Sequence, residues 1–111
     1  MPRRLKNAAD GPASSAKSAA TGEAAVFLEE GVGRFGSGDV RGAIAAWTQA
    51  VFLDPTLAEA WFDLGIAYAD ISDLDESARC YRSAVTLQPQ VHQSWYNLGF
   101  TCAGRGDLVA A

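Results

Sequence analysis

The most informative shortage in this sequence is that of positive charge after its first segment. From Glu23 onward there is no lysine, and five arginines stand against twelve acidic residues, which gives a net charge of −7. Nucleic-acid binding depends on cationic side chains that neutralise phosphates. The composition therefore excludes nucleic acid as the expected partner of this part of the chain.

Metal-binding and catalytic side chains are also scarce. The chain has two cysteines and one histidine, His92, too few for a metal site of the usual Cys/His type. Cys80 and Cys102 lie in helical patterns, where we expect reduced, structural thiols. No Ser/His/Asp or Cys/His arrangement and no glycine-rich loop after a strand is present. We expect no metal, no cofactor and no enzymatic activity.

Long apolar runs are missing as well. No stretch approaches the roughly 18 consecutive apolar residues of a membrane span, and the start of the chain lacks the apolar core of a secretory signal. Residues 1–22 are basic, rich in Ala and Ser and almost without large apolar side chains, so we expect a disordered tail. The chain reads as cytoplasmic, although an organellar transit peptide has a similar composition and stays open as an alternative.

What the sequence does contain is an internal repeat in its acidic part, which we take as one domain at residues 23–111. Glycine, aspartate, proline and tryptophan residues recur there at a fixed step of 34 residues. Such a period is typical of stacked supersecondary units that serve as binding surfaces. The matched sets include Gly31, Gly65 and Gly99; Asp39, Asp73 and Asp107; Ala50 and Ala84; Pro55 and Pro89; Trp61 and Trp95; and Leu64 and Leu98.

Each repeat has the pattern of two amphipathic helices. In residues 58–89 apolar side chains recur at three- and four-residue steps on both sides of a break at Ile71–Asp73. Asp73 is a good N-cap, and Glu76 three residues later completes a capping-box pattern. Pro89 ends the second helix. The repeats are predicted at residues 24–57, 58–91 and 92–111, and the third is incomplete.

The motif W-x-x-L-G-x-x-Y within a helix–turn–helix of this length resembles the tetratricopeptide repeat family. The second repeat carries the signature most fully, with Ser77 where the family usually has alanine, and the resemblance covers residues 24–111. It implies an all-α fold, an α-solenoid of antiparallel helical hairpins with about two and a half repeats. The residues that carry the match are Trp61, Leu64, Gly65, Tyr68, Tyr81, Ala84 and Pro89.

The repeated glycines predict a close approach of helices, because glycine within a helix costs about 1 kcal/mol relative to alanine. We expect Ala50 and Ala84 as the small residues opposite, with Trp47 and Tyr81 wedged between neighbouring helices. Trp61 is expected to act as a core aromatic, whose replacement by alanine would destabilise the fold by roughly 3–5 kcal/mol.

The resemblance also implies a concave groove lined by the first helix of each hairpin. The candidate groove residues have an apolar floor and acidic walls. They are Glu29, Val32, Glu59, Phe62, Asp63, Ile66, Asp70, Tyr96, Asn97 and Phe100. Family members that grip a carboxylate tail use lysine, arginine and asparagine in this groove, and of the corresponding positions here only Asn97 fits. A buried carboxylate would be repelled by Asp63 and Glu59.

Three functions follow as hypotheses. The first is a non-catalytic protein–protein interaction scaffold that binds an apolar or weakly basic peptide or helix in the groove. The second is the repeat part of a larger enzyme, such as a glycosyltransferase, and the third is a self-assembling structural protein. The alternative interpretation of the groove residues is purely structural: the apolar ones pack against neighbouring helices, and the acidic ones keep the surface soluble.

The incomplete third repeat leaves Trp95, Leu98 and Cys102 without the helix that would normally cover them. Three explanations stay open. The chain belongs to a longer array, the first helix of the third repeat caps the domain, or a second copy or partner supplies the missing helix by association with this face.

Overall fold

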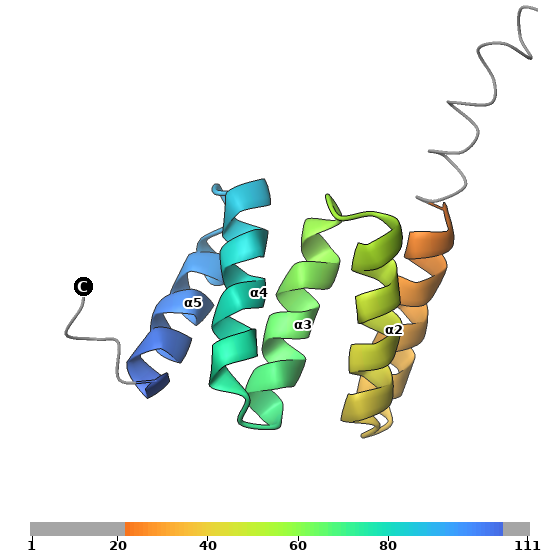
Figure 1. Ribbon diagram of the computed structural model, residues 1–111, viewed down its shortest axis with the longest axis horizontal. Coiled ribbons are helices and arrows are strands. Elements are labelled where there is room, and N and C mark those ends of the chain that lie inside the picture. The colour runs from red at the N-terminus through yellow and green to blue at the C-terminus, as the bar shows by residue number, and fades with distance from the viewer. Residues whose placement is uncertain (1–21, 106–111) are drawn as a thin grey trace, which may run out of the picture.

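The computed structural model describes residues 22–105, and within this range every regular element is a helix. The described part of the first helix covers residues 22–36 and is followed by α2 (Val40–Leu53), α3 (Ala58–Asp70), α4 (Leu74–Leu87) and α5 (His92–Arg105). Consecutive helices run antiparallel and lie side by side along the molecule (Figure 1). The all-α solenoid of helical hairpins is confirmed. Residues 1–21 of the tail expected at residues 1–22 lie outside the described residues, as does the end of the third repeat from residue 106 onward.

The hairpin turns have the same construction in both repeats. Gly38 and Ser72 occupy equivalent positions of the two repeats, have positive φ values of 92° and 65°, and each precede an aspartate that caps the next helix. The Asp39 carboxylate accepts from the backbone N–H of Gly42 at 3.0 Å, and the Asp73 carboxylate accepts from that of Glu76 at 3.3 Å. These caps satisfy N–H groups that have no partner within the helix.

The capping box predicted at α4 is only half formed. Asp73 caps the helix as expected, but the Glu76 carboxylate does not reach back to it. Instead it accepts two hydrogen bonds from the Arg79 guanidinium, at 2.7 and 2.8 Å. A bidentate pair with arginine is stronger than a bond to one neutral N–H group, so the carboxylate turns toward Arg79. The pair also holds the pKa of Glu76 below its usual value.

The turns between repeats are closed by tryptophan. The indole Nε1 of Trp61 donates to the carbonyl of Pro55 at 2.8 Å, and Trp95 donates in the same way to Pro89 at 2.7 Å. Trp61 is only partly buried and packs at the edge of the core. The loss of roughly 3–5 kcal/mol expected for its truncation is therefore too large, because the apolar area it removes from water is smaller than that of a core aromatic.

The core forms where each repeated glycine meets an aromatic ring. A Cβ at Gly31 would collide with the indole of Trp47, and a Cβ at Gly65 would lie 2.6 Å from the ring of Tyr81. Both rings are buried, at 3% exposure. The expectation that Ala50 and Ala84 lie opposite these glycines is wrong. The ring of Trp47 lies against Gly31, and the ring of Tyr81 lies against Gly65.

Within residues 22–105 the third glycine has no such neighbour. A Cβ at Gly99 would meet no atom of these residues within 4 Å. Ser77, which departs from the usual alanine, is fully buried and donates its hydroxyl to the carbonyl of Gly65 at 2.7 Å. This bond offsets the cost of burying a polar group in the core.

Candidate functional site

The candidate groove residues lie on the first helix, α3 and α5. The structure brings Val32, Asp63 and Ile66 together in one pocket of about 280 Å³ between the first helix and α3. We call it the first-junction pocket. Its complete lining consists of Val32, Phe35, Gly36, Trp47, Asp63 and Ile66.

Apolar groups dominate the first-junction pocket. The rings of Phe35 and Trp47 are tilted toward each other with their centroids 5.8 Å apart. The indole Nε1 of Trp47 is its only side-chain hydrogen-bond donor, and it donates to the carbonyl of Leu28 at 3.0 Å. Trp47 thus offers the pocket an apolar surface and no polar side-chain atom.

Asp63 is the one ionisable side chain in this lining. Burial raises its pKa to about 6, and the negative charge of Glu59, one helical turn earlier, adds to the effect. Among residues 22–105 the Asp63 carboxylate has no hydrogen-bond or ion-pair partner. An ionised carboxylate in such surroundings is stabilised by a cationic or N–H donor, which a ligand can bring.

The corresponding position in the next repeat has a partner. The Asn97 side chain interacts with the phenol of Tyr81 and lowers its pKa, and Tyr81 occupies the same place in the second repeat as Trp47 does in the first. Burial raises the pKa of Tyr81 to about 12 in spite of this interaction. The Phe62 ring packs against Tyr81 with a centroid distance of 5.8 Å. At this second junction the polar and apolar groups satisfy each other.

Glu59 and Phe62 line a second pocket of about 260 Å³ near the turn between α4 and α5, where Gln93 joins them. The other groove residues are exposed. Tyr96 and Phe100 on α5 are 70% and 72% exposed, with their rings 6.3 Å apart, and Glu29 and Asp70 lie at the surface of the first helix and α3. Under the alternative interpretation, Phe62 and Phe100 would both pack against neighbouring helices. Phe62 does pack against Tyr81 of α4, whereas the Phe100 side chain is exposed.

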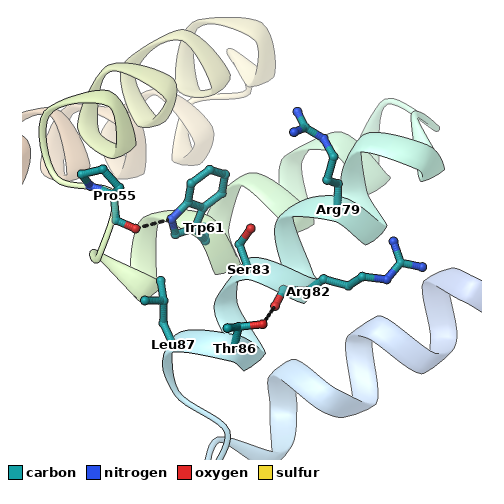
Figure 2. A pocket seen from close by; sticks show the side chains of 7 residues that line it. All are labelled: Pro55, Trp61, Arg79, Arg82, Ser83, Thr86 and Leu87. Carbon is teal, nitrogen blue, oxygen red and sulfur yellow. Dashed lines mark hydrogen bonds between the residues drawn. The ribbon is translucent and has the colours of Figure 1, made fainter.

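A further pocket, of about 380 Å³, lies on α4 beside the α2–α3 turn and was not anticipated from the sequence. Figure 2 shows the Trp61 ring between Pro55 and α4, with the Arg82 side chain extending toward α5. The signal that could have revealed it is the helical spacing of the α4 residues that face Trp61. Its lining consists of Pro55, Trp61, Arg79, Arg82, Ser83, Thr86 and Leu87.

The arginines of this pocket differ in their partners. Arg79 is held by Glu76, as described above. Arg82 places Nη2 4.0 Å from the Cys102 sulfur and has no carboxylate partner within residues 22–105.

Cys80 and Cys102 are both free thiols, and burial raises the pKa of Cys80 to about 12, which keeps it protonated. In the described part of the chain no group of three or more His, Cys, Asp or Glu side chains is placed to hold a metal ion.

None of the described helices is both long and apolar enough to cross a bilayer.

Comparison with known proteins agrees with this architecture. The tetratricopeptide repeat family matches residues 28–92 and 62–111, so the chain belongs to that family. No curated protein matches the chain.

Three solved structures illustrate the shared fold. The second TPR of Spaghetti (RPAP3), bound to the HSP90 peptide SRMEEVD, has a TM-score of 0.80 at 21% identity and covers 85% of this chain and 86% of its own. The TPR2AB domain of yeast Sti1, in a pHSP90 complex, has a TM-score of 0.76 at 17% identity, with coverages of 97% and 43%. MamA has a TM-score of 0.74 at 23% identity. The match covers 78% of this chain and only 50% of the MamA chain, so this chain spans about half of MamA's length. At these identities the likeness shows the fold alone.

Proposed function

We propose that this chain is a non-catalytic protein–protein interaction scaffold whose concave groove binds an apolar or weakly basic peptide or helix. The observation that carries the proposal is Asp63, a carboxyl group in an apolar pocket with no donor of its own among the described residues. A ligand that brings an arginine or lysine to this carboxylate replaces the hydration that burial removed.

Peptide binding as a class is supported by the fold neighbours. The RPAP3 structure contains an HSP90 peptide and the Sti1 structure is a pHSP90 complex, and the peptide SRMEEVD is acidic at its C-terminal end. In this chain the groove carries Asp63 and Glu59, and α3 has no basic residue. An acidic peptide would place like charges together, which costs affinity. We therefore propose a ligand of the opposite charge to that peptide.

The shape of the groove suggests how such a ligand binds. One apolar side chain enters the first-junction pocket between Val32 and Ile66, and a neighbouring cation pairs with Asp63. Tyr96 and Phe100, exposed on α5, offer a second apolar contact farther along the groove. Two apolar anchors on one face with a cation between them match an amphipathic helix or an extended segment.

A peptide array tests this function. Sequences that combine Leu or Phe with Arg or Lys are expected to bind the chain, and acidic sequences are not. Asp63→Asn removes the charge at the pocket and should weaken the best hits by about tenfold, a loss typical of one charge-assisted contact.

The matched control is Gln49→Lys, which alters the net charge by the same amount at an exposed position of α2. It should leave binding within about twofold of the parent. An array without preference for basic and apolar sequences, or equal losses in the two variants, would argue against the groove.

A further inference from the structure

We propose that residues 3–6 of this same chain, Arg-Arg-Leu-Lys, dock intramolecularly in the groove at the first-junction pocket and compete there with other ligands. The inference rests on the proposed function, because it names a ligand for that same site. It commits to the chain's own N-terminal segment as the occupant.

The chemistry of this segment matches the groove. Leu5 is flanked by three cations, Arg3, Arg4 and Lys6, and apart from Met1 it is the only large apolar side chain among residues 1–21. The first-junction pocket offers the complement, with apolar walls from Val32, Phe35 and Ile66 around the Asp63 carboxylate. Leucine fits the apolar walls, and a flanking guanidinium supplies the donor that Asp63 lacks within residues 22–105.

The distribution of charge favours the same pairing. Residues 1–22 carry a net charge of +3, whereas residues 23–111 carry −7. The acids of α3, Glu59, Asp63 and Asp70, all belong to the groove set, and the helix has no base to balance them. Opposite charges attract over roughly a Debye length of 10 Å and raise the encounter rate of the two segments.

The segment is long enough to reach the pocket. Val32 lies ten residues beyond residue 22 in the first helix, which corresponds to about 15 Å. The fifteen residues between Lys6 and residue 22 can span up to about 50 Å when extended. A segment joined by a linker of this length has an effective concentration near the millimolar range, so even weak docking is populated.

The test uses the full chain and a synthetic fluorescent peptide with the sequence of residues 1–17. In the triple variant Arg3→Ser/Arg4→Ser/Lys6→Ser the chain's own segment no longer matches the groove, so the peptide should bind about tenfold more tightly than to the parent. Adding Asp63→Asn to the triple variant should reverse this gain. Lys17→Ser, which removes a cation outside the proposed segment, should behave like the parent.

Several results would overturn the inference. Equal peptide affinity in the parent and the triple variant would show that the groove is not occupied by its own segment. A dimer that light scattering detects in the parent but not in the triple variant would assign the groove to a second copy of the chain.

The peptide array separates this inference from the proposed function. If array peptides bind through Asp63 while the peptide of residues 1–17 does not, the docking is wrong and the proposed function stands. If neither kind of peptide binds, both are wrong.

Discussion

The two junctions between consecutive repeats use the same positions with different chemistry. At the second junction Tyr81 covers Gly65 and interacts with the Asn97 side chain. At the first junction Trp47 covers Gly31, but its only side-chain donor is bound to Leu28, and Asp63 takes the place of Asn97. The aromatic residue keeps its packing role in both, while only the second junction satisfies its polar groups internally.

This difference explains where a ligand is expected. A repeat fold needs a large ring over each covered glycine, and both tryptophan and tyrosine meet that need. Exchanging tyrosine for tryptophan removes a hydroxyl from the groove, and exchanging asparagine for aspartate adds a charge. Together the two exchanges give a pocket in which the Asp63 carboxylate has no donor among residues 22–105, which is why we propose it as the binding site.

Removing the ring at the first junction should have the largest effect. Trp47→Ala deletes a side chain that is 3% exposed, together with its hydrogen bond to Leu28. We expect a loss of about 3–5 kcal/mol in the free energy of unfolding, measured by urea denaturation. The half-buried Trp61 is the control, and Trp61→Ala should cost about 1–2 kcal/mol. Similar losses in both variants would contradict the central position assigned to Trp47.

The glycines provide the next test, because Gly65 is covered and Gly99 is not. A Cβ at Gly65 would lie 2.6 Å from the Tyr81 ring, so Gly65→Ala forces this buried ring to move. The expected destabilisation is about 1–3 kcal/mol. The new methyl group of Gly99→Ala meets no atom of residues 22–105 within 4 Å, so this change should be neutral or stabilise the helix by up to about 1 kcal/mol. Thermal melting of both variants decides the point, and a loss at Gly99 equal to that at Gly65 would break the comparison.

Replacing Asp63 by asparagine gives the first junction the residue of the second. The folded state holds the Asp63 proton more tightly than the unfolded chain, in which the group titrates with a pKa near 3.8. The contribution of Asp63 to stability should therefore be greatest below pH 4 and fall as the pH rises through about 6. Asp63→Asn should remove this fall and be more stable at pH 7 by about 1–2 kcal/mol, allowing for the part of the carboxyl that water still reaches.

This comparison is made in the Arg3→Ser/Arg4→Ser/Lys6→Ser background, so that the basic N-terminal residues do not stabilise the carboxylate. Parallel stability curves for the two proteins between pH 4 and 7 would show that Asp63 is an ordinary surface acid.

The smallest change copies the other half of the second junction. Trp47→Tyr places a phenol beside Asp63 as Tyr81 places one beside Asn97. A hydrogen bond from this phenol to the carboxylate should lower the pKa of Asp63 by about one unit. A ¹³C NMR titration in the same triple-variant background measures it, and an unchanged midpoint would mean that the two junctions do not share this geometry.

Much of the fold could be predicted from local patterns. Asp73 and Pro89 mark where α4 begins and ends because capping and the lack of a backbone donor act within a few residues. The partner of each glycine could not be found this way. Gly31 lies on the first helix and Trp47 on α2, and only the packing of the two helices shows that they meet.

The chemistry of the groove was predictable only in part. Its acidic and apolar composition is visible in the sequence, and the structure places Val32, Asp63 and Ile66 in one pocket. That Asn97 interacts with Tyr81 depends on where two side chains from different helices end. The pocket beside Trp61 was missed for the same reason, since its lining combines a turn with one face of α4.

The most direct test of the proposed groove is the pKa of the Asp63 carboxyl, measured by ¹³C NMR in the triple variant with and without the strongest peptide from the array. The account predicts a midpoint near 6 in the unbound protein and a fall of at least about one unit when a peptide cation pairs with the carboxylate. A midpoint near the ordinary 3.8 in the unbound protein, or one that a bound peptide leaves unchanged, would contradict it.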